Sequence, residues 1–280
     1  MTRTIAQQAE LALLLEVGTT PKPGNVDRHR DHNELHFEHF LAGAVGASAG
    51  LEALADPDGP PIGVAFERAV EGMSDQSGGN TQFGGLLLLA PLVRAAALGE
   101  LTPDRARRIA EGTGVEDTVG FYRAFEHVDV AVADPPEDMD TLDVRRGSGA
   151  VPAVRQRNLS LYDIMERSAD HDGIAREWTG NFERTFDAAE AIKTRDGPVT
   201  DRAAAIFLDM LAADPDTFVA INHGEEVAEN VRERAAAARD GRVDPGTLAE
   251  ELITEGINPG TTADLLAGGL FVALLRGVDV

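Results

Sequence analysis

The chain has 280 residues, enough for one large domain or two small ones, and 43% of them are apolar, as in an ordinary globular protein. It contains no cysteine, which excludes disulfides, thiolate nucleophiles and zinc–thiolate sites. Its 48 acidic residues outnumber 25 basic ones, for a formal charge of −23, and no basic stripe suits nonspecific nucleic-acid binding.

The scarcity of lysine and the distribution of the acidic residues indicate the salt conditions in which the protein works. Only two lysines accompany 23 arginines, and the acids are spread along the whole chain instead of forming an acidic tail. Screening by salt makes such self-repulsion tolerable, so we favour a protein adapted to a salt-rich cytosol over an ordinary acidic mesophile protein.

Membrane and export signals are absent from the sequence pattern. The longest apolar stretch, residues 83–99, is broken by Pro91 and Arg94, and the first 18 residues lack a basic region before an apolar run and a cleavage site. We therefore expect a cytoplasmic protein that does not enter the membrane.

The apolar residues recur with helical spacing almost throughout the chain. No convincing alternation of apolar and polar residues predicts a strand; the best candidate, residues 128–133 ("VDVAVA"), is short. The pattern predicts an all-α fold, taken as a single domain over residues 1–280. Helices are expected near the N-terminus, ending at Gly18, and over 34–55, 62–73, 80–98, 103–112, 115–127, 159–171, 174–193, 199–213, 223–239, 245–255 and 260–276.

The first stretch with chemical interest is "TTPKPGNVD", residues 19–27. Two prolines restrict the backbone on either side of Lys22, and Gly24 permits an abrupt bend after it. A lysine held in this way suits a phosphate group as a point charge, whereas the simpler interpretation is a helix-ending turn with an exposed lysine. The scarcity of lysine favours the phosphate.

Asp27 and Asp31 follow directly and are candidates for Mg²⁺ or for a substrate hydroxyl. Four histidines at positions 29, 32, 36 and 39 would share one face of a helix, a spacing that metal ligands could use. The segment is too polar to be securely helical, so we interpret most of these histidines as ordinary polar residues.

Residues 74–85, "SDQSGGNTQFGG", are dense in glycine and precede a strongly apolar helix. Backbone N–H groups at a helix N-terminus attract anions, and glycine lets a phosphate or a ring approach closely. The stretch lacks the lysine of a Walker motif. Asn80, Thr81 and Gln82 supply neutral donors and acceptors, and a buried helix-packing seam is the alternative.

The least helical region is residues 134–158, long for a plain connection. Its four arginines could grip phosphate or could be counter-charges on a solvated loop. We weigh these two interpretations equally.

Two later stretches place polar groups at helix starts. Residues 214–231 bring Asp216, which suits an N-cap, close to His223 and Glu225. In residues 257–275 the polar group comprises Asn258, Thr261, Thr262 and Asp264, at the mouth of an apolar helix.

Together these blocks resemble one family, the triphosphoribosyl-dephospho-CoA synthases that serve citrate lyase and malonate decarboxylase. "TTPKPGNVD", "GGNTQFGG", "DPDTFVAINHG" and "NPGTTADLLAGGLF" carry the resemblance over nearly the full chain. It implies an all-helical enzyme that joins the triphosphoribosyl group of ATP to a ribose hydroxyl of 3'-dephospho-CoA and expels adenine.

The resemblance also implies site residues. The matching positions are Glu16, Lys22, Asp27, Asn80, Thr81, Asp216, Asn258 and Asp264. Displacement at an anomeric carbon needs carboxylates, and a triphosphate needs Mg²⁺, a cation and helix N-termini. We expect catalysis from Glu16, Asp27 and Asp216; nucleotide binding by Lys22, Asn80, Thr81, Gln82, Asn258, Thr261 and Asp264; and Mg²⁺ ligands in Asp27, Asp31 and Asp216.

The chain departs from the family at identifiable positions. Gln82 and Phe83 replace a histidine and a lysine, and Phe218 stands where an asparagine is usual. We therefore expect a diverged, haloarchaeal-type branch. A related pentosyltransferase with another acceptor and a noncatalytic nucleotide-binding protein are the alternatives, and whether the chain forms a homo-oligomer is left open.

Overall fold

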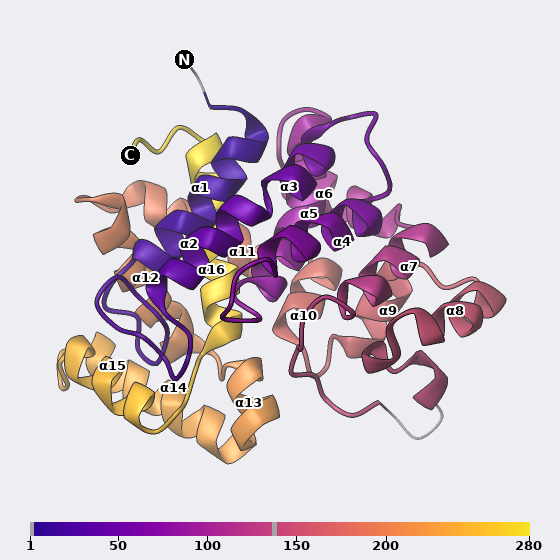
Figure 1. The fold of residues 1–280 in the computed structure, drawn as a ribbon. Helices are drawn as coiled ribbons and strands as arrows, with labels where there is room; N and C mark the ends of the chain where they lie inside the picture. The colour runs from indigo at the N-terminus through magenta and orange to yellow at the C-terminus, as the bar shows by residue number, and fades with distance from the viewer. Residues whose placement is uncertain (1–2, 136–138) are drawn as a thin grey trace.

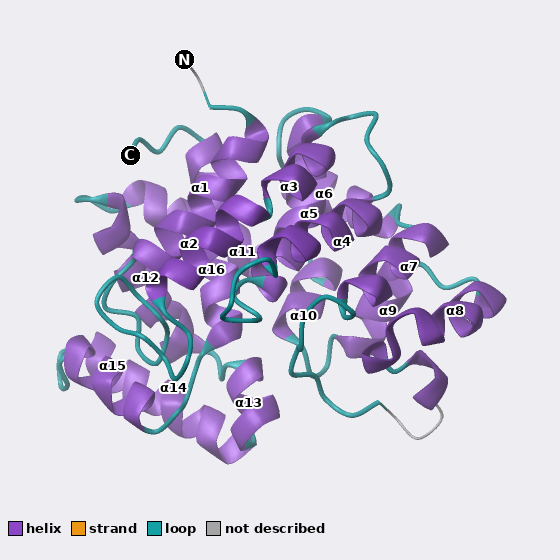
Figure 2. Cartoon of the chain, viewed as in Figure 1, coloured by secondary structure: helices purple, strands orange, loops and turns teal. Residues whose placement is uncertain are grey.

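The structure is a computed structural model that describes residues 3–135 and 139–280. Within these residues all regular elements are helical, and only two isolated β-bridges occur (Figure 2). The predicted all-α fold is confirmed. The α-helices are α1 Ile5–Gly18, α2 Phe37–Gly46, α3 Ser48–Ala55, α4 Ile62–Met73, α5 Phe83–Ala97, α6 Pro103–Glu111, α7 Val115–Ala124, α8 Val151–Arg157, α9 Leu161–Ser168, α10 Gly173–Thr179, α11 Glu183–Thr194, α12 Val199–Ala213, α13 Thr217–His223, α14 Glu225–Arg239, α15 Pro245–Thr254 and α16 Gly260–Leu275.

The core forms around the two most apolar helices, α5 and α16. Both are buried over nearly their whole length because their sequences are apolar on all sides. Helix α16 packs against α1, α5 and α11. Figure 1 shows α13, α14 and α15 below α1 and α2, with α7, α8 and α9 on the other side of the molecule. The site described below lies where the starts of α5 and α16 meet the end of α1.

The sequence predicts one continuous helix over 34–55, and this is wrong: the structure has two separate helices, α2 and α3. The break follows Gly46, where the chain passes directly over α4. A Cβ atom at Gly46 would lie 2.0 Å from the carbonyl oxygen of Gly72. Only glycine allows this approach, and Ala47 then joins the two helices.

The expected helix 174–193 is also interrupted. Asn181 and Phe182 adopt left-handed backbone angles (φ 63° and 59°), which end α10 and begin α11. Buried Glu177 accepts hydrogen bonds from Arg184 N at 3.2 Å and Thr185 N at 2.9 Å, so its carboxylate caps the first turn of α11.

Two regions are more helical than expected. Residues 134–158 contain two 3-10 helices, η1 (Asp140–Leu142) and η2 (Val144–Ala150), followed by α8. The joint after Asp216 forms the short helix α13, which Asp216 caps as predicted. The segment 27–36 is instead a loop with two bridges, so the four histidines share no helical face.

Candidate active site

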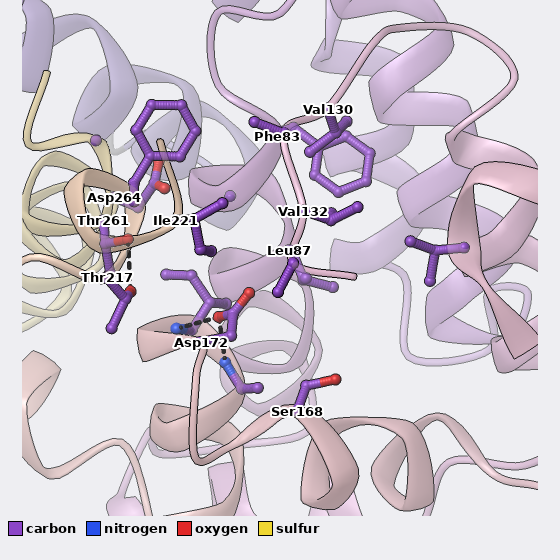
Figure 3. Close-up of a pocket in the computed structure, with 18 of the residues that line it drawn as sticks. Phe83, Leu87, Val130, Val132, Ser168, Asp172, Thr217, Ile221, Thr261 and Asp264 are labelled. Carbon is purple, nitrogen blue, oxygen red and sulfur yellow. Dashed lines mark hydrogen bonds between the residues drawn. The ribbon is translucent and has the colours of Figure 1, made fainter. Parts of the chain in front are cut away.

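A cavity of about 670 Å³ opens between the starts of α5, α10, α13 and α16, the end of α1 and residues 130–135 (Figure 3). Figure 3 shows Thr217, Thr261 and Asp264 across the cavity from Val130 and Val132, and we call these the polar and the apolar side, although Ile221 lies on the polar side and Asp134, Asp143, Arg167 and Asp170 also line the wall. The polar side includes Glu16, Asn25, Asn80, Thr81, Gln82, Asp172, Thr217, Asn258, Thr261 and Asp264; the apolar side includes Phe83, Leu87, Phe121, Phe125, Val130, Val132, Leu142, Ile164 and Met165.

Glu16 reaches the cavity from the last turn of α1, and Lys22 lies behind it. The Lys22 ammonium is fully buried and bonds to a Glu16 carboxylate oxygen. Burial raises the pKa of Glu16 above its ordinary value, although the charge of Lys22 opposes the shift. The restricted turn thus aims Lys22 at Glu16, and Lys22 itself is not part of the cavity wall.

Asp27 organises the loop that follows α1. Its carboxylate accepts hydrogen bonds from Thr20 Oγ1 at 2.8 Å, Lys22 N at 3.2 Å, His29 N at 2.8 Å and the Arg30 guanidinium at 3.2 Å. These bonds fix the backbone on both sides of Lys22. Asp27 is fully buried and lies outside the cavity wall.

Asp31 lies on the surface. Its side chain accepts from the backbone N–H of Phe37 at 3.1 Å and contacts the His36 ring at 2.9 Å. The hydrogen bond with His36 lowers the pKa of Asp31 and raises that of His36.

The loop also joins the other end of the chain at the cavity. Asn25 donates to Asn258 Oδ1 at 2.8 Å and to the Pro259 carbonyl at 3.0 Å. Both asparagines line the cavity, so the motif at residues 19–27 and the motif that begins at Asn258 contribute to one wall. Next to them, the hydroxyls of Thr217 and Thr261 lie 3.0 Å apart, as Figure 3 shows.

Asp264 projects from the second turn of α16 toward the start of α5. A Cβ atom at Gly84 would lie 2.1 Å from its Oδ2 atom, so only glycine leaves room for this carboxyl group. Burial raises the pKa of Asp264 well above its ordinary value, and the nearby charges of Glu16 and Asp216 raise it further. The environment therefore favours the protonated form of Asp264.

Asp216 is buried and bonded entirely within the protein. One oxygen accepts from Phe218 N at 2.9 Å and Val219 N at 3.1 Å; the other accepts from the Thr262 N–H and hydroxyl, both at 2.7 Å. Asp216 thereby ties α13 to α16. It supports the wall from behind and does not line it.

The motif before α5 contributes three wall residues. Asn80 Oδ1 accepts a hydrogen bond from the N–H of Phe83, the first residue of α5, at 3.1 Å. The Thr81 hydroxyl and both ends of the Gln82 carboxamide are buried and have no hydrogen-bond partner within the described parts of the chain. Buried polar atoms are normally paired, so these groups are suited to a ligand.

The predicted Mg²⁺ ligands are not brought together. Asp27 and Asp216 direct their oxygens to protein donors, and Asp31 is on the surface. Over residues 3–135 and 139–280, no group of three or more His, Cys, Asp or Glu side chains is placed to hold a metal ion. These three residues do not fit a shared Mg²⁺ site. The carboxyl groups that line the cavity are Glu16, Asp134, Asp143, Asp170, Asp172 and Asp264.

Comparison with known proteins identifies the family of the chain. The profile of one family, described as "ATP:dephospho-CoA triphosphoribosyl transferase", matches residues 2–279. The chain belongs to this family.

Two relatives of these transferases support the assignment. A 2-(5''-triphosphoribosyl)-3'-dephosphocoenzyme-A synthase of Pectobacterium atrosepticum is 28% identical over 294 residues, covering 94% of this chain and 86% of the relative. A crystal structure from Archaeoglobus fulgidus, described as a triphosphoribosyl-dephospho-CoA synthase, superposes with a TM-score of 0.69 at 27% identity; the match covers 85% of this chain and 99% of that one. None of the described helices of this transferase is long and apolar enough to cross a membrane.

Some residues of the candidate site had no signal in the sequence. Asp172 caps α10 by accepting from Ile174 N at 2.7 Å and Ala175 N at 3.0 Å, and it lines the cavity; burial raises its pKa. Its position in "DHDG" resembles any helix cap. In the region 134–158, Arg145 pairs with Asp134 and Asp143, and Arg155 with Glu116, which supports the interpretation of counter-charges.

Proposed function

We propose that the reaction of the family takes place in this cavity: the triphosphoribosyl group of ATP passes to a ribose hydroxyl of 3'-dephospho-CoA, and adenine leaves. The bond between the ribose anomeric carbon and adenine breaks, and adenine takes the electron pair and a proton. The acceptor oxygen forms the new bond to the anomeric carbon and loses its proton.

The observation that carries the proposal is a pair of carboxyl groups with different surroundings on one wall. Glu16 has Lys22 bonded to it, whereas Asp264 is surrounded by other carboxyl groups. Such a difference separates the roles of acid and base. We assign Asp264 as the acid that protonates adenine, and Glu16 as the base that accepts the hydroxyl proton and faces the positive charge developing on the ribose.

The triphosphate has a place at the helix starts. The N-termini of α5 and α16 both reach the cavity, and each carries part of a positive helix dipole and N–H groups that attract anions. Mg²⁺ enters as part of the Mg·ATP substrate, for which one or two wall carboxylates and the phosphate oxygens are ordinary ligands.

Adenine release from Mg·ATP in concentrated KCl, with and without 3'-dephospho-CoA, tests the proposal. We expect release that depends on the acceptor. Asp264→Asn and Glu16→Gln should each lower the rate at least about 100-fold, whereas Glu226→Gln, an exposed residue on α14, should leave it unchanged. Bound ATP without adenine release under any condition would reject catalysis and leave a nucleotide-binding protein.

A second candidate is the same transfer to a different acceptor. The presence of Gln82 and Phe83 on the wall, in place of the histidine and lysine of the resembling family, favours it. Adenine release that requires another hydroxyl compound and ignores 3'-dephospho-CoA would establish this alternative.

A further inference from the structure

The segment 128–135 runs along the apolar side of the cavity after α7. Its side chains alternate in exposure: Asp129, Ala131 and Ala133 are exposed, whereas Val130 and Val132 are partly buried. Residues 130–135 all contribute to the lining of the cavity. This alternation is that of an extended chain. Figure 3 shows both valines on the same side of the cavity as Phe83, away from Thr217 and Thr261.

The backbone of this segment is not used by the fold. No backbone hydrogen bond joins residues 128–135 to any other residue within 3–135 and 139–280. Peptide groups in proteins are normally paired, and an extended chain with free N–H and C=O groups is a template for another strand. A ligand with amide groups along an extended arm can therefore add to it as a strand would.

We propose that the segment 128–135 binds the pantetheine arm of the acceptor, which rests on the proposed function because that function supplies the acceptor. The arm contains two amide groups separated by methylene groups and so resembles a short peptide. Its amides would pair with the free backbone, and its apolar parts would contact Val130, Val132 and Leu87.

This placement separates binding from chemistry. Asp264, Thr261 and Thr217 lie on the other side of the cavity from the two valines (Figure 3). An arm held on the apolar side would leave the nucleoside half of the acceptor to face Asp264 and Glu16. Binding of a remote part of a substrate is a common way to position the reacting part.

Calorimetric binding of two matched ligands tests the subsite without relying on adenine release. ADP is 3'-dephospho-CoA without the pantetheine arm. We expect 3'-dephospho-CoA to bind at least about tenfold more tightly than ADP, as for two or more amide hydrogen bonds and buried methylenes. Equal dissociation constants would overturn the proposal, whatever the outcome for transfer.

Adjacent proline substitutions locate the contact. Successive N–H groups of an extended chain point to opposite edges, so Ala131→Pro and Val132→Pro remove donors from different edges. We expect one of them to weaken 3'-dephospho-CoA binding about threefold to tenfold and the other to change it less than about twofold, with ADP binding unchanged in both. Val132→Ala corrects for the lost side chain. Equal losses in both variants, or equal losses for both ligands, would reject pairing with the backbone.

Discussion

Lys22 and Glu16 form an ion pair inside the protein, and its energetics follow from the burial of both groups. Lys22→Met would leave the Glu16 carboxylate buried without its counter-charge. We expect the free energy of unfolding, measured in urea, to fall by about 3–5 kcal/mol. Adding Glu16→Gln should restore most of the loss, because the double variant carries no charge at either of these two positions; a single variant as stable as the wild type would contradict this.

The role of Lys22 toward nucleotide stays a prediction. Its ammonium bonds to Glu16 behind the wall, so its effect on ATP would act through that carboxylate. ATP affinity of folded Lys22→Met, measured by calorimetry, should fall by a few kcal/mol at most, as for one charge-assisted contact. An unchanged affinity would leave Lys22 with a structural role alone.

Asp264 makes stability depend on pH in a defined direction. Its pKa is raised in the folded state, so the fold retains a proton that the unfolded chain releases. Stability should therefore fall as the pH rises from the ordinary carboxyl pKa toward the folded one, by about 1.4 kcal/mol for each unit of the shift. Asp264→Asn should be more stable than the wild type at pH 7 and should flatten this dependence in urea titrations, while adenine release is lost. A variant less stable at pH 7 would show that the carboxyl group is charged and favourably bound.

A substitution of Gln82 should change the stability of the protein and its activity in different directions. Both ends of its carboxamide are buried and have no protein partner among the described residues. Gln82→Leu removes this desolvated group, so we expect unfolding free energy to stay equal or rise by about 1–2 kcal/mol. Adenine release should fall in the same variant. Loss of stability without loss of release would show that the carboxamide serves only the fold.

The sequence predicted residues in and around the candidate cavity, but it did not predict which of them line it. Glu16, Asn258 and Asp264 do line the cavity, but Asp27 and Asp216 support it from behind. A motif places residues in a neighbourhood, whereas the direction of a side chain depends on which backbone N–H groups it meets. Those partners, such as Thr262 N for Asp216, lie far away in the chain.

Among the helices, the crossing of α2 over α4 leaves no room for a larger residue. At Gly46 a Cβ atom would lie 2.0 Å from the Gly72 carbonyl oxygen, and backbone cannot move aside cheaply. We expect Gly46→Ala to cost about 1–3 kcal/mol in thermal or urea unfolding. Gly18→Ala is the control, because nothing lies within 4 Å of a Cβ atom there; equal effects at both positions would contradict the prediction.

Periodicity predicted most helices but not their interruptions. The breaks after Gly46 and at Asn181–Phe182 depend on contacts with α4 and with the Glu177 carboxylate. Neither contact changes the spacing of apolar residues along the chain. Periodicity did not predict the helical turns within 140–157, because these turns are short and contain few apolar residues at helical spacing.

For the molecule as a whole, the charge of −23 predicts a stability that depends on salt. Repulsion among dispersed acids weakens as the Debye length falls from about 10 Å at 0.1 M to about 3 Å at 1 M. We expect the thermal midpoint to rise by several degrees over this range of KCl. Screening saturates near 1 M, so a rise confined to higher concentrations would point to exclusion of salt from the surface instead.

The two carboxyl groups assigned to the chemistry come from opposite ends of the chain, Glu16 on α1 and Asp264 on α16, which pack together. This has a consequence for synthesis. A growing chain makes the Glu16 half of the wall first and lacks the other half until α16 leaves the ribosome. Activity should therefore arise in one late step, and a chain terminated before α16 would have no complete cavity in which to consume ATP.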